Sequence, residues 1–596
     1  MSVLDRIERL RNVMEQQKID CYIIPTDDYH HSEYVGDYFK FREYITGFTG
    51  SAGTAVFTKD KAGLWTDGRY FIQAEAQLQG SGITLYKSGE PGVPTIEEFL
   101  KSELKEGDVL GFDGRTVTYA QGKRYCHITD ENGASLKYSL DFAQNIWKER
   151  PEMSMESVFS LADEYTGEKI GSKLERIREI MKENGCNAHV LSSLDDIAWL
   201  LNIRGNDIAY CPLVLSYAIV YNNSVELFAD IRKFSDDIVN SLAENQVKIY
   251  PYEDIYRKVS EMTSEDKLLL DSSIMNYSLY QAISKETVIV DKQNPEILMK
   301  SVKNETQAEN LRKAHLKDAV AHTKFMYWLK KNIGRVEITE LSASARLEGL
   351  RAEQEHFLGP SFGPISAYGE HGAIVHYSAD EKSNVPLKEG KLFMTDTGGH
   401  YLEGSTDITR TVALGEVGNL EKEHFTLVAR AMLRLANTVF LYGCSGANLD
   451  CIAREIFWKE GLNFNHGTGH GVGYLLNIHE GPINFRWKER EKPAPALEEN
   501  MVITDEPGIY IEGSHGIRLE NELLVRKTVK NEYGQFMNFE ILTYVPIDLD
   551  AILPEKMSTE EKEMLNHYHK QVYEKVSPYL SEEERIWLKE YTRAVK

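Results

Sequence analysis

The hydrophobic pattern at the start of the chain returns about a quarter of the way along it. Residues 7–14, IERLRNVM, place apolar side chains at a helical spacing, and LERIREIM at 174–181 repeats the pattern. This spacing predicts an amphipathic helix in both places. After each helix, at 19–26 and at 186–193, a short apolar segment is typical of a buried strand.

Two hairpin-like patterns continue the parallel. TAVFTKDKAGLW at 54–65 and YAIVYNNSVELF at 217–228 each alternate apolar and polar positions around a polar turn. Charged amphipathic helices resemble one another, but the shared order and near-constant offset favour an internal duplication. We therefore predict two similar α/β domains, at 1–155 and 156–303.

The remainder of the chain has a different pattern. Residues 295–303 are predicted to form a linker, and a long helix is predicted from about Asn304. Strands rich in histidine, glycine and acidic residues follow between 356 and 525. We predict a third domain at 304–596, with a helical extension from about residue 550, since 596 residues exceed what one core holds.

Acidic residues occupy strand positions in this third part. KLFMTDTGGHYLEGSTDITRTVAL at 391–414 is predicted to form a strand, a glycine turn and a second strand. Asp396 shares a face with Met394, and Asp407 shares a face with Thr409, because side chains alternate along a strand. Two buried carboxylates on neighbouring strands repel each other unless a cation lies between them.

A second acidic pair follows in the same kind of pattern. MVITDEPGIY at 501–510 is predicted to form a strand ending at Glu506. HGIRLENELLV at 515–525 is predicted to form one further strand, on which Glu520 alternates with apolar residues and Glu522 follows in phase.

Between these acidic strands lies a segment of three histidines and five glycines, HGTGHGVGYLLNIHEG at 466–481. Glycine costs about 1 kcal/mol at each helical position, so we predict a loop or strand here. The glycines would let the backbone come close to another group.

The charges of these residues indicate a metal centre. Four carboxylates and one neutral imidazole balance two divalent cations. Each of these residues taken alone could be an ordinary residue of a strand edge, a turn or the core. All five together, in alternating strands around glycine turns, favour a metal-binding site. Carboxylate-rich ligation suits Mn²⁺, with Zn²⁺ or Co²⁺ as alternatives. Two such ions can share a water and supply a bridging hydroxide near neutral pH, which is the chemistry of hydrolysis.

Composition narrows the class of protein further. The net charge of −24 argues against a nucleic-acid partner. The charged N-terminus is not a secretory signal, and no apolar run approaches a membrane span. The six cysteines are scattered and are expected to be reduced core residues. We therefore expect a cytoplasmic protein without a membrane partner.

Five short motifs resemble the dinuclear site of the pita-bread metallopeptidases, and most closely the long, three-domain Xaa-Pro aminopeptidases: TDTGGHY, STDITRTVALG, HGTGHGVG, TDEPGIY and GIRLENELL. Segments along nearly the whole chain share the resemblance. It implies an α/β (α+β) fold, with two creatinase-type domains before a pita-bread catalytic domain and its helical C-terminal extension.

The resemblance also assigns roles to residues of the third domain. It implies five ligands for two divalent ions: Asp396, Asp407, His470, Glu506 and Glu520. Asp407 and Glu520 would bridge the ions, and Asp396 would hold one of them. Glu506 would ligate the other and carry a proton from the bridging water to the leaving amine.

Other residues would contact the peptide. By resemblance His376, His466 and His479 line the substrate pocket and hydrogen-bond the peptide or the tetrahedral intermediate. Arg518, two residues before Glu520 on the same strand face, is expected to orient a carboxylate and is counted with the substrate-binding residues. The glycines of residues 466–481 would, by the same resemblance, let the backbone pass close to the metals and substrate. Arg69 resembles a first-domain arginine that reaches the substrate, in its own subunit or in a partner's, and a homodimer is expected.

The function implied is hydrolysis of the N-terminal Xaa-Pro bond of peptides that have proline at the second position. That bond is a tertiary amide without an N–H, so it needs a dedicated site. Four alternatives stay open: a prolidase restricted to dipeptides, a methionine aminopeptidase, a metal-free creatinase-like enzyme and a pita-bread module that only binds partners.

Overall fold

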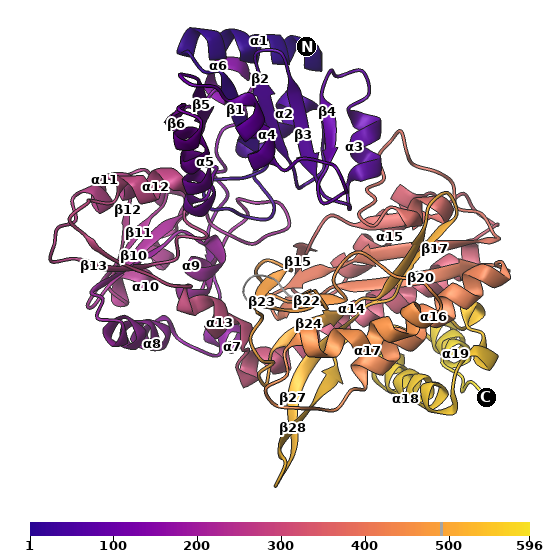
Figure 1. Ribbon diagram of the computed structural model, residues 1–596. Helices are drawn as coiled ribbons and strands as arrows, with labels where there is room; N and C mark the ends of the chain where they lie inside the picture. The colour runs from indigo at the N-terminus through magenta and orange to yellow at the C-terminus, as the bar shows by residue number, and fades with distance from the viewer. Residues whose placement is uncertain (489–492) are drawn as a thin grey trace. The chain divides into compact units, whose positions relative to one another are not determined.

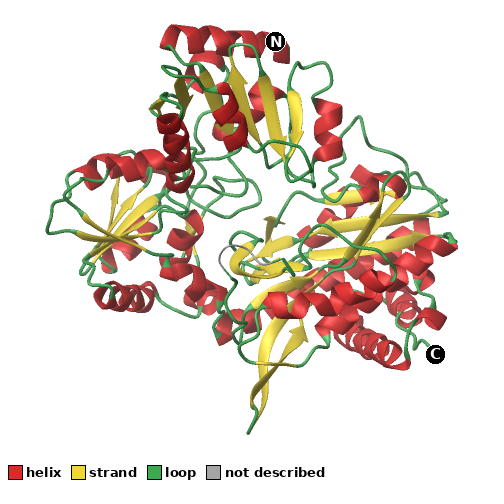
Figure 2. Cartoon of the chain, in the orientation of Figure 1, coloured by secondary structure: helices red, strands yellow, loops and turns green. Residues whose placement is uncertain are grey.

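The computed structural model describes residues 1–488 and 493–596. It divides into two compact units, Met1–Ser160 with Lys169–Glu296, and Leu161–Glu168 with Ile297–Lys596. Helices and strands are mixed in both units (Figure 1, Figure 2), which confirms the predicted α/β class. Within the described ranges, no helix is both long and apolar enough to cross a membrane.

The first unit contains two six-stranded sheets with one plan. The first has the order β4-β3-β2-β1-β5-β6, with bounds β1 (Cys21–Pro25), β2 (Thr54–Thr58), β3 (Ala62–Thr66), β4 (Thr84–Lys87), β5 (Val109–Phe112) and β6 (Ser135–Lys137). The second has the order β12-β11-β10-β8-β13-β14, with bounds β8 (Ala188–Leu191), β10 (Tyr217–Tyr221), β11 (Val225–Phe228), β12 (Val247–Tyr250), β13 (Lys267–Leu270) and β14 (Val288–Asp291).

Strand directions also agree between the two sheets. In each, the first strand pairs antiparallel with one arm of a hairpin and parallel with a later strand. The helices predicted before them are α1 (Val3–Gln17) and α8 (Ile170–Glu183). Both bury the apolar face that the spacing predicted, including Leu10 and Ile177. The prediction of two similar α/β domains is confirmed at the level of fold.

The second unit begins with the predicted long helix, α14 (Glu305–Asn332), whose N-cap Asn304 forms a capping box. The predicted linker before it is wrong, because residues 295–301 form the helix α13 (Pro295–Ser301). A proline is compatible with the first helical position, where its missing N–H costs nothing.

The strands of the second unit form one large sheet and several small ones. The six-stranded sheet has the order β21-β28-β27-β24-β22-β23, with bounds β21 (Phe440–Leu441), β22 (Gly469–Gly471), β23 (Glu480–Phe485), β24 (Val502–Asp505), β27 (Asn521–Asn531) and β28 (Gly534–Ile541). A three-stranded sheet joins β16 (Ile365–Tyr368), β17 (Lys391–Thr397) and β20 (Ile408–Leu414), and a two-stranded sheet joins β25 (Gly508–Ile511) and β26 (His515–Arg518).

One expectation about these strands is wrong. Residues 515–525 were predicted as a single strand, but the chain leaves β26 after Arg518 and enters β27 at Asn521. β26 pairs with β25, whereas β27 pairs with β24 and β28. All residues around the break are buried, so the alternation carried no sign of it. The break leaves the amide of Glu520 free to donate to Thr409 O at 3.1 Å.

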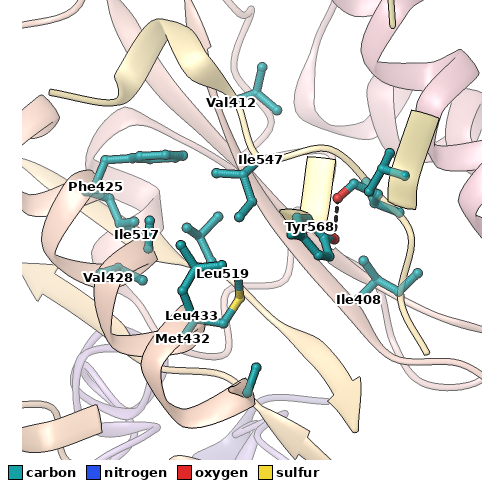
Figure 3. Packing of buried hydrophobic residues seen from close by; sticks show 14 of the residues in the cluster. Ile408, Val412, Phe425, Val428, Met432, Leu433, Ile517, Leu519, Ile547 and Tyr568 are labelled. Carbon is teal, nitrogen blue, oxygen red and sulfur yellow. Dashed lines mark hydrogen bonds between the residues drawn. The ribbon is translucent and has the colours of Figure 1, made fainter. Parts of the chain in front are cut away.

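Helices and strands of this unit share one apolar core. Figure 3 shows side chains of β20, α16 (Asn419–Ala436) and β26 meeting there, among them Val412, Phe425 and Ile517. The predicted C-terminal helices are present as α18 (Thr559–Val576) and α19 (Glu582–Tyr591). Tyr568 of α18 is 1% exposed and donates to Val545 O at 2.6 Å, so the extension belongs to the core.

The cysteines only partly match their prediction as core residues. No disulfide is present among the residues that the structure describes, and Cys21, Cys186 and Cys211 are buried. Cys451 is exposed, because α17 (Gly446–Lys459) turns that position outward.

Candidate metal centre

The three-stranded sheet brings the first two predicted ligands together. β17 pairs antiparallel with β20, which places Asp396 opposite Thr409. Asp407 directly precedes β20, so it lies beside Asp396 at the same end of the hairpin. Both residues are largely buried: the exposed fraction is 8% for Asp396 and 4% for Asp407. The period-two pattern therefore located this pair of acids.

The other three predicted ligands come from the large sheet and the break beside it. His470 lies in β22, Glu506 follows β24, and Glu520 lies between β26 and β27. Side-chain ligand atoms within 4.8 Å of one another form three groups: Asp396, Asp407 and Glu520; His470, Glu506 and Glu520; Asp407, His470 and His479. Asp407, His470 and Glu520 each belong to two groups, so these three residues join the groups into one centre.

The electrostatics of these acids favour a bound cation. Burial and the neighbouring Asp396 raise the pKa of Asp407 to about 7. Burial also raises the pKa of Glu506 and of Glu520, with further acids adding to the effect. One buried oxygen of Asp396, Oδ1, accepts no hydrogen bond. Divalent ions would offset the crowding of negative charge and use this oxygen, so the residues fit a metal centre.

His470 is oriented as a metal-binding imidazole is. Its Nδ1 lies 3.0 Å from Gly471 O, and a carbonyl only accepts, so Nδ1 carries the proton. The lone pair is then on Nε2, which lies 3.5 Å from Asp407 Oδ2 and 3.7 Å from Glu506 Oε1. A second hydrogen bond of this kind usually sets the tautomer of a ligating histidine.

The glycines of this segment allow close packing between strands. A Cβ on Gly469 would lie 1.8 Å from Thr504 O, and one on Gly471 would lie 2.3 Å from Glu480 O. The close approach seen here is therefore to the backbone of neighbouring strands, whereas the sequence led us to expect an approach to metals and substrate. By admitting β22 beside β24, these glycines bring His470 near Glu506.

Arg518 holds Asp396 in place. Its Nε lies 3.1 Å and its Nη2 lies 2.5 Å from Asp396 Oδ2. Its Nη1 donates to Tyr510 Oη at 2.7 Å. The contact with a carboxylate that was expected of Arg518 is thus made within the centre, to a predicted ligand.

His466 has protein partners at both ring nitrogens. Nδ1 donates to Gly467 O at 2.7 Å, and Nε2 accepts from Tyr510 Oη at 2.8 Å. Burial and the nearby Arg518 lower the pKa of His466 to about 3, so it stays neutral. In this state its geometry suits holding Tyr510 better than contacting a peptide.

The two other predicted pocket histidines also lie near the centre. The His479 ring centroid is 4.4 Å from that of His470, and His479 groups with Asp407 as a possible ligand. His376 follows Val375, whose carbonyl accepts from Arg518 Nη2 at 3.3 Å. His376 is also close enough to His466 to lower its pKa.

Two further residues support the centre and were not assigned from the sequence. Glu522 is fully buried, and its Oε1 accepts from the Asp407 amide at 2.7 Å. Its Oε2 lies 3.1 Å from Nε2 of His315, which is also fully buried. Glu522 was visible as an acid in a buried strand, but its partner on α14 lies far away in the sequence.

Arg69 belongs to the first unit and is described there by itself. It lies between β3 and α3 (Phe71–Gln77). Its guanidinium donates to both carboxylate oxygens of Asp67, at 2.8 and 2.7 Å.

Comparison with known protein families covers nearly the whole chain. Two models described as the creatinase/prolidase N-terminal domain match residues 6–136 and 149–307. The model of metallopeptidase family M24 matches residues 309–527, and that of the C-terminal region of this peptidase family matches 535–595.

Similar proteins share this full length. "Xaa-Pro aminopeptidase 1" of Dictyostelium discoideum is 36% identical over 97% of this chain and 94% of its own. "Aminopeptidase P1" of Arabidopsis thaliana is 34% identical over 99% of both. An X-prolyl aminopeptidase structure from Caenorhabditis elegans, described as a cytosolic enzyme with a dinuclear active site, superposes with a TM-score of 0.95, 33% identity and full coverage of both chains. The chain therefore belongs to metallopeptidase family M24, within its Xaa-Pro aminopeptidases, and it is a hydrolase.

Proposed function

We propose that this enzyme releases the N-terminal residue from peptides whose second residue is proline, using two divalent metal ions. The observation that carries the proposal is the convergence of four acids and one histidine, from several strands and the residues beside them, on a single centre. The dinuclear active site named for the C. elegans enzyme, which matches the full chain, supports it.

In this proposal Asp396, Asp407, His470, Glu506 and Glu520 hold the ions. When bound, two such ions lower the pKa of a shared water far enough to give a hydroxide nucleophile near neutral pH. The four carboxylates favour Mn²⁺, with Zn²⁺ and Co²⁺ as alternatives. Asp407 and Glu520 are the two carboxylates that belong to two ligand groups each, which supports a bridging role for both.

Glu506 is proposed to move the proton. It directly follows β24, and burial raises the pKa of its carboxyl. A raised pKa suits a group that takes a proton from water and returns it to the leaving amine. His376 and His479 are proposed to hydrogen-bond the peptide, His466 and Arg518 to keep Tyr510 and Asp396 in place, and Arg69 to reach the substrate.

A prolidase is the nearest alternative, because it would use the same ligands on dipeptides. A structure of Xaa-Pro dipeptidase from Bacillus anthracis covers only 64% of this chain, with a TM-score of 0.51 and 25% identity. The full-length match to X-prolyl aminopeptidase therefore favours activity on longer peptides.

Hydrolysis of matched peptides distinguishes an Xaa-Pro aminopeptidase from a prolidase. We expect the Mn²⁺-loaded enzyme to release lysine from Lys-Pro-Pro, and to leave Lys-Ala-Ala intact. Turnover of Lys-Pro alone would instead identify a prolidase. Cleavage of Lys-Ala-Ala at a rate equal to that of Lys-Pro-Pro would exclude the proposed specificity.

Three further points belong to this proposal. We infer domain boundaries near residues 155 and 303, whereas the matched family models change between residues 136 and 149 and between residues 307 and 309. A homodimer is proposed from the resemblance, and light scattering in solution tests it. A cytoplasmic location is proposed because the C. elegans enzyme is described as cytosolic.

A further inference from the structure

A pair of histidines lies apart from the ligand groups of the predicted metal centre. His424 is on α16, and His515 is the first residue of β26. His424 Nδ1 lies 2.9 Å from His515 Nε2, and the rings are 5.1 Å apart between centroids. A helix and a strand hold the two rings, so their separation is set by packed elements.

The hydrogen bonds around the pair place one lone pair between the rings, on His515 Nε2. His515 Nδ1 lies 2.8 Å from Ser514 Oγ, which can accept its proton and leave the lone pair on Nε2. Burial lowers the pKa of both His424 and His515, which favours neutral rings. In that tautomer His424 Nδ1 donates a hydrogen bond to His515 Nε2 at 2.9 Å, and a cation can replace this proton when His424 carries its own proton on Nε2. A ligating imidazole whose other N–H is bound in this way is typical of a metal site.

The spacing of the side chains suits a transition metal, and the distance comes close to what one requires. Two imidazole nitrogens bound to one tetrahedral Zn²⁺ at about 2.0–2.1 Å lie about 3.3–3.4 Å apart, so the two rings, now at hydrogen-bond distance, must part slightly to admit the ion. Glu421 precedes His424 by one helical turn, in the Glu-x-x-His spacing that places a carboxylate and an imidazole on one helix face. Glu421 and His424 are only half-buried, so an ion can reach them.

Two acidic residues of α16, Glu421 and Glu423, lie near the histidine pair. Glu421 turns toward Gly418, where an added Cβ would lie 2.3 Å from its Oε2, so its side chain has to rotate away from there to join the two rings. The negative charge of Glu421 raises the pKa of both histidines and so partly offsets the lowering by burial. Glu423 is instead paired with Lys556 at 3.3 Å.

We propose that His424, His515 and Glu421 form an additional divalent-metal site, separate from the dinuclear centre, that takes Zn²⁺. Imidazole-rich ligation suits Zn²⁺, Ni²⁺ and Cu²⁺ better than Mn²⁺. An ion here ties α16 to β26, the strand that carries Arg518. Zn²⁺ at this site therefore strengthens the packing of an element on which the metal centre depends.

Metal counting tests the site directly. The Mn²⁺-loaded enzyme is incubated with Zn²⁺, passed through a desalting column and submitted to elemental analysis for total metal. We expect wild type to retain one metal ion per chain more than His424→Gln does. Because only the difference between the two proteins is measured, the result does not depend on how many ions the dinuclear centre holds. It also does not depend on whether Zn²⁺ replaces Mn²⁺ there. Equal totals in wild type and His424→Gln would overturn the proposal.

Matched variants make the test specific. His567→Gln changes an exposed histidine on α18 and should retain the wild-type total. Zn²⁺ should raise the thermal midpoint of wild type and of His567→Gln, but not of His424→Gln. Without added Zn²⁺, His424→Gln should match wild type in peptidase activity, which shows that it is folded. Glu421→Gln should weaken Zn²⁺ retention; unchanged retention would remove Glu421 from the site.

Discussion

At the scale of single residues, the candidate metal centre consists of acidic side chains whose burial disfavours their charged form. Asp407 and Glu520 are almost fully buried, and both have raised pKa values. Such positions are costly unless a cation is bound. The arrangement of side chains therefore explains why the centre should bind divalent ions strongly and why it depends on them.

Glu506 is the residue whose loss should separate chemistry from folding. Glu506→Gln keeps the size and most hydrogen bonds but removes the proton carrier and one ligand charge. We expect kcat to fall by about 10²–10⁴-fold or more, the usual contribution of general acid–base catalysis. The far-ultraviolet circular dichroism spectrum should not change. Glu512→Gln, an exposed change six residues away, is the control and should keep full activity. Near-normal turnover by Glu506→Gln would remove this residue from its role.

Glu522 offers a test of support for the centre. Glu522→Leu leaves the buried Asp407 amide without its acceptor and His315 without its carboxylate. An unsatisfied buried group costs about 1–3 kcal/mol. We expect weaker metal retention on dialysis, with a smaller loss for Glu522→Gln, which keeps an acceptor oxygen. Wild-type metal retention by the leucine variant would show that Glu522 does not position Asp407.

At the scale of elements, the sequence predicted those features that depend on local patterns. Period-two alternation located Asp396 and Asp407, and glycine content excluded a helix at residues 466–481. The break between β26 and β27 was missed, because every residue around it is buried. The contact between Glu522 and His315 joins β27 to α14, and no local pattern reports such a distant pairing.

The C-terminal helices should contribute to stability as core elements. Leu565 of α18 is fully buried, whereas Ile586 of α19 is 66% exposed. Leu565→Ala should lower stability by about 2–5 kcal/mol through lost burial and a cavity. Ile586→Ala is the matched control and should change it by less than about 0.5 kcal/mol. Urea titration of both variants measures the difference, and equal effects would show that α18 does not belong to the core.

At the scale of the whole molecule, metal binding should couple to pH. In the metal-free protein the pKa of Asp407 is about 7, above the usual value of 3.8. The folded state therefore holds a proton that the unfolded chain has released, and stability falls as pH rises from about 4 through 7. Metal removes this cost, since the ion takes the place of the proton.

The thermal midpoint should follow accordingly. The difference between metal-loaded and chelator-treated enzyme should be larger at pH 8 than at pH 5. Differential scanning fluorimetry at constant ionic strength measures it. A difference that shrinks as pH rises would contradict the assignment of Asp407 and its neighbours to a shared metal centre.

The central claim is that two metal ions in one centre drive removal of the residue before proline. Its most direct test combines elemental analysis with hydrolysis of Lys-Pro-Pro and Lys-Pro, with and without Mn²⁺. We predict two ions bound at the acidic centre in enzyme loaded with Mn²⁺ alone, cleavage of the tripeptide, and loss of this cleavage on chelation that added Mn²⁺ reverses. Neither metal nor cleavage under these conditions would contradict the account and leave the five ligand positions without their proposed role.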